Sequence, residues 1–138
     1  MKLQERYSTL KKCYKDSLIL IKSGLFYITY DEDAYLLNYL FDYQVIDNKV
    51  GFPSSKIDSV KEELKKCQIN VYISDTDEFI QNNENKYVSI VALAHKNYFN
   101  ELNIKVLLEE ISFLLHNNQE NIIKVKNFIN ELWFYSFK

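Results

Sequence analysis

The stretch Ser23–Asp33, SGLFYITYDED, decides how the rest of the sequence is interpreted. It opens on a turn at Gly24, where glycine permits positive φ. The aromatic and β-branched segment Leu25–Tyr30 follows and is typical of a strand. Because the apolar run Leu18–Ile21 precedes the turn, the two segments predict a β-hairpin. The three acids at its end predict the start of a helix, with Asp31 as N-cap and the other two favoured by the helix dipole.

Outward from this hairpin, the pattern predicts alternating helices and strands. Residues 2–15 repeat apolar residues at helical spacing with lysines opposite, and a second helix runs from the acids to about Phe41. A Ser55–Asp58 capping box predicts a third helix. The predicted strands that remain are 43–46, 49–52, 69–73 and 87–94, with a polar turn at 74–78.

From about Tyr98 the apolar period becomes helical. One stripe runs from Ile104 to Leu115 and a second from Ile122 to Trp133, separated by a loop at 117–121. These stripes predict a C-terminal helical hairpin that either packs on the sheet or is offered to a partner. The fold class is α/β, a mixed sheet of about five or six strands flanked by helices. We expect an α/β domain over residues 1–100 and a helical extension over 101–138.

Composition narrows the classes of function. The chain has 138 residues and a net charge of −2, which argues against a strongly basic nucleic-acid binder. Charge is uneven, because residues 1–22 hold six Lys and Arg against two acids, whereas residues 31–47 hold five acids and no base. The two cysteines are far apart, and neither a signal peptide nor an apolar run of membrane-spanning length is found. These features predict reduced thiols, a cytoplasmic location and no membrane partner.

The sequence offers no constellation for catalysis. Its only two glycines, Gly24 and Gly51, cannot form a phosphate-binding Walker loop or a dinucleotide fingerprint. No His and Cys residues have zinc-site spacing, and the acids at 31–33 are interpreted as helix-capping residues rather than as a metal site. We therefore expect no enzyme activity, no cofactor and no metal.

The order of motifs carries a resemblance. A basic helix and an apolar strand lead to G-x-F-Y at Gly24–Tyr27, then to Y-D-E-D-A at Tyr30–Ala34. V-G-F-P at Val50–Pro53 and N-V-Y-I at Asn70–Ile73 follow. This order resembles the N-terminal mismatch-recognition domain, domain I, of the MutS family of DNA mismatch-repair proteins. In that family a helix and strand lead to G-D-F-Y-E, F-x-x-D-A and A-G-[IV]-P before a V-A-[IVL] strand. The resemblance covers roughly residues 3–75.

The resemblance implies a DNA-binding role without catalysis. By position Phe26 matches the family's phenylalanine, which enters the minor groove and stacks on the mispaired base. Gly24, Gly51 and Pro53 match the motif's turn residues. The chain departs from the motif at Leu25, which replaces an Asp, and at Ile28, which stands where the family has Glu. Because isoleucine cannot hydrogen-bond a base, that part of mispair reading is lost, while stacking by Phe26 remains available.

Two main hypotheses follow. In the first, Phe26 and Tyr27 stack on weakly bound double-stranded DNA, distorted or mismatched. The candidate phosphate contacts are Lys11, Lys12, Lys15 and Lys22. The alternative for Phe26 is packing on a half-buried strand, and for the lysines a solvated helix face.

In the second hypothesis the chain is a protein-interaction or oligomerisation module that kept the fold but lost mismatch reading. It would bind a partner or a second copy through residues 104–137, including the aromatic end at Trp133, Phe134, Tyr135 and Phe137. A third hypothesis is an accessory protein of a mobile element or repair complex, supplying the domain in trans.

Overall fold

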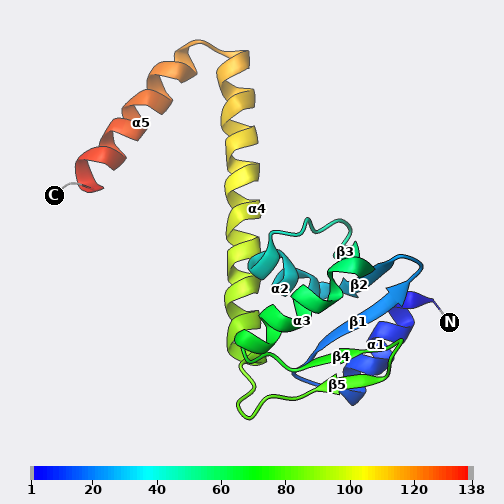
Figure 1. The fold of residues 1–138 in the computed structure, drawn as a ribbon. Coiled ribbons are helices and arrows are strands. Elements are labelled where there is room, and N and C mark those ends of the chain that lie inside the picture. Colours follow the sequence, from blue (N-terminus) through cyan, green and yellow to red (C-terminus); the bar gives the residue numbers. More distant parts are fainter. Residues whose placement is uncertain (1, 137–138) are drawn as a thin grey trace. The chain divides into compact units, whose positions relative to one another are not determined.

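A computed structural model describes residues 2–136, with side chains up to Trp133. Its centre is a five-stranded mixed sheet in the order β3-β2-β1-β4-β5 (Figure 1). Strand β1 pairs antiparallel with β2 and parallel with β4, and both edge pairs are antiparallel. The strands are β1 (Leu18–Ser23), β2 (Phe26–Tyr30), β3 (Lys49–Pro53), β4 (Val71–Ile73) and β5 (Glu78–Ile80). The expected α/β class with a mixed sheet flanked by helices is confirmed.

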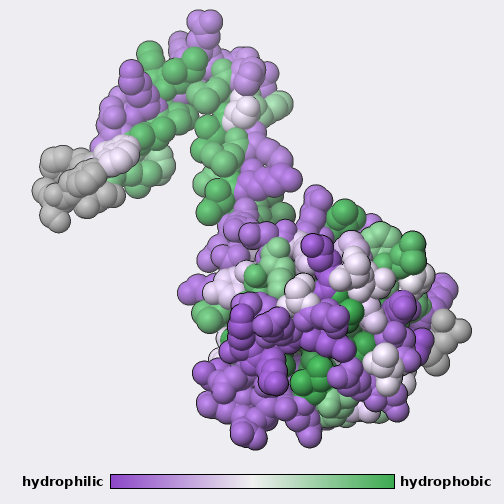
Figure 2. Space-filling model, in the orientation of Figure 1, coloured by the Kyte–Doolittle hydropathy of each residue, from purple (hydrophilic) through white to green (hydrophobic). Residues whose placement is uncertain are grey.

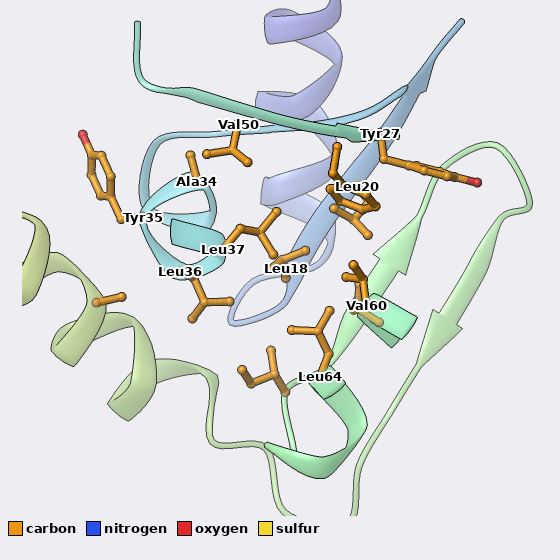
Figure 3. Packing of buried hydrophobic residues seen from close by; sticks show 14 of the residues in the cluster. Leu18, Leu20, Tyr27, Ala34, Tyr35, Leu36, Leu37, Val50, Val60 and Leu64 are labelled. Atoms are coloured by element: carbon orange, nitrogen blue, oxygen red, sulfur yellow. The ribbon is translucent and has the colours of Figure 1, made fainter. Parts of the chain in front are cut away.

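Helices cover both faces of this sheet because its strands alternate apolar side chains between them. Leu18 and Leu20 of β1 belong to the larger core, and Ile19 and Ile21 to a smaller core on the other face. Helix α1 covers the smaller core, and α2, α3 and the first part of α4 cover the larger one. Figure 3 shows the larger core, with labelled side chains from α2, α3 and strands β1, β2 and β3. The helices are α1 (Leu3–Cys13), α2 (Asp31–Phe41), α3 (Ile57–Lys66) and α4 (Tyr87–Asn117).

Two predicted helix caps are absent. Asp31 does not cap α2; it is the first residue of that helix, with φ of 52°, and its backbone N–H donates to the carbonyl of Asn48. Ser55 and Asp58 form no capping box, because Ser54–Lys56 makes a short 3₁₀ turn, η1, before α3, and no side chain caps α3. In both places backbone contacts set the chain direction at the helix start.

The predicted strand at 87–94 is wrong, because these residues form the first turns of α4. Tyr87 and Ala94 are buried in the larger core, and Ile90, Val91 and Tyr98 pack against it. These five positions follow helical spacing, whereas Val88 and Leu93 are exposed. No turn separates the segment from the helix that follows, so extending that helix backwards requires no new nucleus.

Two further strand predictions need correction. The segment 43–46 contributes only one bridge, between Ile46 and Lys49, since Tyr43 and Val45 pack against the core. The tight turn between Ile46 and Lys49 has Asp47 and Asn48 at positive φ. The strand predicted at 69–73 is shorter, and the polar turn after it leads into β5, which the sequence did not predict.

The chain divides into two compact units, Met1–Tyr98 and Phe99–Lys138. The second unit, here called the helical tail, holds the C-terminal part of α4 and helix α5 (Glu120–Ser136). The carbonyl of Leu114 accepts from the backbone N–H of Asn118 and from the side-chain amide of Asn121, which closes the end of α4. Phe137 and the side chains of Phe134 and Tyr135 lie outside the described part of the chain.

Candidate nucleic-acid interface

The tip of the β1–β2 hairpin, residues Ser23–Phe26, presents two apolar side chains to solvent. Ser23 pairs with Phe26, so Gly24 and Leu25 form a two-residue turn, with Gly24 at φ of 59°. Glycine with positive φ at the first central position is the pattern of a type II′ turn, which suits the twist of a hairpin. The carbonyl of Leu25 accepts a 2.8 Å hydrogen bond from the backbone N–H of Ser54. The turn is therefore held both by the pairing of β1 with β2 and by this contact with Ser54.

Phe26 is half-exposed, with 49 % of its surface accessible, at the start of β2. It pairs with Pro53 of the edge strand β3. Beside it lies a hollow of about 330 Å³ lined by Leu25, Phe26, Pro53, Ser54 and Ser55. Phe26 is therefore only partly packed, and about half of its surface stays accessible to a ligand.

Tyr27 points the other way. Its side chain is buried in the larger core (Figure 3), where the ring stacks on Phe52 at 5.7 Å between centroids. Its hydroxyl donates to the Asp75 carboxylate at 3.0 Å. Burial, followed by this hydrogen bond, raises the pKa of Tyr27 above its ordinary value. The structure places this ring in the core rather than beside Phe26, so it offers no free face to a base.

Lys11 is engaged inside the protein. Its Nζ lies 2.9 Å from the nearer carboxylate oxygen of Asp33 and donates also to the carbonyl of Ser17. It donates to the Tyr87 hydroxyl and lies 4.3 Å from the centre of that ring. With these partners the Lys11 ammonium is committed to the fold rather than to a phosphate.

Asp33 is fully buried and accepts hydrogen bonds from four groups on three elements of the fold, α1, β1 and α4. Besides Lys11 it takes hydrogen bonds from the hydroxyls of Tyr7 and Tyr87 and from the backbone N–H of Ile19. We call Asp33 and these partners the Asp33 cluster. Burial, followed by the charge of Asp33, raises the pKa of both tyrosines well above the ordinary value. The local sequence predicts only that Asp33 complements the helix dipole, whereas the structure shows it as a buried acceptor that joins α1, β1 and α4.

The candidate phosphate contacts lie at two ends of the hairpin. Lys22 pairs with Tyr27 next to the tip and is exposed. Lys12 and Lys15 are exposed at the C-terminal end of α1, where they share a hollow of about 510 Å³ with Asp31 and Glu32. That end adjoins the start of β1, which lies about 15 Å along the strand from the tip. Lys22 is the nearest of these lysines to the tip, although its pairing with Tyr27 places it on the face of the sheet opposite to Phe26, while the other two share their surroundings with acids.

Residues 1–100 match the family model of MutS domain I. The chain belongs to this family. No curated protein matches the chain. The match covers the whole of the first compact unit, whereas most of the helical tail lies beyond it.

Because the chain belongs to the MutS domain I family, its hairpin residues can be compared with the family motif position by position. The motif glycine, Gly24, keeps the positive φ that favours glycine, whereas Gly51 has room for a Cβ, whose nearest neighbour would lie at 3.7 Å. Ile28, at the position of the motif Glu, is half-buried and packs against the core under α1. Leu25, at the position of the motif Asp, is instead 78 % exposed.

The F-x-x-D-A motif of MutS domain I also offers a signal for Asp33. The aspartate of that motif falls on Asp33, which the structure shows as the acceptor for α1, β1 and α4.

Within residues 2–136 no three His, Cys, Asp or Glu side chains converge on a common metal position. No helix in this part of the chain combines the length and apolar character needed to cross a bilayer.

Proposed function

We propose that this MutS domain I protein is a non-enzymatic DNA-binding module in which Phe26 stacks on a base of a distorted duplex. The supporting observation is the half-exposed Phe26 ring, which stands at the motif position and on a turn held by backbone hydrogen bonds. Stacking of an aromatic ring on a base is worth about 1–3 kcal/mol. The cytoplasmic location expected from the sequence is part of this proposal.

Weak and salt-dependent binding follows from the surroundings of Phe26. Phosphate contacts supply most sequence-independent affinity, and of the four proposed lysines only Lys22 is exposed beside the tip. The Glu that would hydrogen-bond the base is replaced by Ile28, which removes about 0.5–1.5 kcal/mol of net interaction. The module then binds through stacking and charge, with little discrimination between mispaired bases.

Fluorescence anisotropy with labelled duplexes of 20–30 base pairs tests this proposal. Perfect, mismatched and single-base-loop duplexes are compared at low and moderate salt for the wild type and Phe26→Ala. We expect Phe26→Ala to weaken binding about five- to 150-fold, the range that corresponds to about 1–3 kcal/mol. Tyr39→Ala is the matched control, because Tyr39 is an exposed aromatic on α2. Equal binding by wild type and Phe26→Ala, or no binding to any duplex at low salt, would contradict the proposal.

A second candidate function is self-association through the helical tail, which one observation favours. Figure 2 shows apolar side chains gathered on the surface of the helices beyond residue 98. Ten of these side chains are between 46 % and 68 % exposed: Ile104, Val106, Leu107, Leu108, Phe113, Leu114, Ile122, Ile123, Phe128 and Ile129. Together they expose on the order of 800 Å² of apolar surface. That is about the area each partner contributes to a stable interface, which a second copy of the chain would supply.

Sedimentation velocity across a hundredfold range of protein concentration tests this second function. We expect a concentration-dependent dimer that Leu107→Lys abolishes. Leu93→Lys is the control, since Leu93 is similarly exposed on the first part of α4. A monomer at all concentrations would eliminate self-association and leave only a different protein as partner for residues 104–137.

A further inference from the structure

Leu25 has no role in the fold that accounts for its position. It is 78 % exposed, the largest value among the exposed large apolar residues of the described chain. The two central positions of a tight hairpin turn usually carry Gly, Asn or Asp, which tolerate its geometry and interact well with water. An aliphatic side chain there gains nothing from burial in the folded protein.

The backbone under Leu25 is fixed although its side chain is free. Its carbonyl is bonded to Ser54, Gly24 provides the positive φ, and Phe26 is paired on both sides, with Ser23 and Pro53. A group already held in one place loses little further entropy when it binds. The tip is therefore preorganised to insert Leu25 as well as Phe26.

The surroundings of Leu25 match the chemistry of an unstacked base step. Leu25, Phe26 and Pro53 line one hollow with two serines, and no charged side chain lines it. Apolar side chains such as Leu and Phe are the groups that enter the minor groove and separate neighbouring bases. With Leu in place of the motif Asp, the tip brings no negative charge toward the phosphates on either side.

We propose that Leu25 forms a two-residue apolar wedge with Phe26, and that this wedge separates a base step without reading the identity of its bases. This inference rests on the proposed function of Phe26. Neither Leu25 nor Phe26 carries a hydrogen-bonding side-chain atom, and Ile28 carries none where the motif has Glu. The wedge therefore responds to how easily a step unstacks, and an extra nucleotide has already lowered that cost.

The test measures affinity for duplexes that differ only at their centre. One is perfectly paired, one has a G·T mismatch, and four carry a single extra A, C, G or T. Proteins are the wild type, Leu25→Ala, Leu25→Asp, Phe26→Ala and the control Ile46→Ala, which removes an exposed apolar side chain at the other end of the hairpin. Fluorescence of 2-aminopurine beside the extra nucleotide reports unstacking independently of affinity.

We expect Leu25→Ala to weaken binding to all four extra-nucleotide duplexes about five- to tenfold. Leu25→Asp is expected to weaken it further, and both variants to lower the 2-aminopurine signal. Thermal unfolding should be unchanged, because the side chain is exposed. Wild-type affinity for Leu25→Ala, with Phe26→Ala weakened, would overturn the role of Leu25 and leave the proposed function standing. Affinities that differ more than tenfold among the four extra bases would overturn base independence, and no wild-type binding at all would overturn both proposals.

Discussion

Asp33 links α1 to the rest of the domain, in addition to the apolar contacts that α1 makes with the smaller core. Its carboxylate is fully buried, and its acceptor capacity is used by two tyrosine hydroxyls, one ammonium and one backbone N–H. A buried carboxylate persists only when it is paired and hydrogen-bonded, as this one is. Lys11 belongs to the same set, so its charge serves the fold.

Replacing Asp33 is expected to destabilise the protein. Asp33→Asn leaves the Lys11 ammonium without its counter-charge, and this should cost about 3 kcal/mol, near the low end for such pairs because the Lys11 side chain is 25 % exposed. Urea unfolding followed by circular dichroism measures the loss. Asp31→Asn, an exposed acid of the same helix turn, should change stability by less than about 0.5 kcal/mol. The double variant Asp33→Asn with Lys11→Met should recover part of the loss, and strictly additive losses would contradict the pairing.

The two raised tyrosine pKa values predict how stability falls at alkaline pH. A tyrosine with a higher pKa in the folded than in the unfolded protein contributes fully below the unfolded value of about 10. Above it the unfolded chain loses its proton first, so the contribution of Tyr7 and Tyr87 is lost as pH rises toward their folded values. Tyr87→Phe should be less stable at pH 8 but decline less steeply between pH 10 and 11.5. The urea midpoints of wild type and Tyr87→Phe across this pH range measure the decline in stability, and Tyr39→Phe is the control. Equal declines for wild type and Tyr87→Phe would contradict the prediction.

Residue roles were predictable where they depend on local sequence and were missed where they depend on distant partners. The positive φ of Gly24 follows from its place in a hairpin and is observed. Asp33 accepts a hydrogen bond from Tyr87, which is 54 residues away in the sequence. The residues around Asp33 do not predict that contact. The same holds for Lys11, whose spacing suggested a solvated face.

At the scale of elements, the β1–β2 hairpin determines where the candidate site lies. Its register places Phe26 beside Ser23 and Pro53, and its alternation sends Tyr27 to the core. The sequence predicted this hairpin because its strands and its turn carry agreeing signals. It mispredicted residues 87–94 because a short, fully apolar run is compatible with either a buried strand or a buried helix. Tertiary packing of every third or fourth residue decided in favour of the helix.

The hairpin turn gives a prediction that separates its two motif glycines. Gly24→Ala should cost about 1–2 kcal/mol, because the left-handed conformation is strained for alanine although a Cβ would meet no neighbour within 4 Å. Gly51→Ala is the matched comparison, since its Cβ would make only ordinary contacts, at 3.7 Å, in a backbone conformation that alanine accepts. Urea unfolding measures both. Equal losses would show that strand packing, rather than backbone geometry, accounts for the motif glycines.

Over the whole molecule, charge is arranged so that the two ends of the hairpin differ. The tip has an uncharged hollow on the face of Phe26 and Lys22 on the opposite face, whereas the other end of the hairpin mixes Lys12 and Lys15 with Asp31 and Glu32. A phosphate approaching that second end meets both signs of charge. We therefore expect DNA affinity to depend most on the lysine beside the tip.

The salt dependence of DNA binding tests this difference. Each phosphate neutralised contributes about −0.9 to the slope of log affinity against log salt. Lys22→Gln should reduce the magnitude of the slope by about 1, and Lys12→Gln by less. Lys65→Gln, an exposed lysine in the last turn of α3, is the control. An unchanged slope for Lys22→Gln would remove this lysine from the interface.

The Asp33 cluster also has a consequence for the order in which the chain folds. Its members come from residues 7 to 87, and the contact between Lys11 and Tyr87 joins groups 76 positions apart. Closing so long a loop is entropically costly, whereas the hairpin and α2 need only local contacts. We therefore expect the rate-limiting nucleus to form without Tyr87 and the cluster to close afterwards. On that order of events, removing the Tyr87 hydroxyl would speed unfolding more than it slows folding.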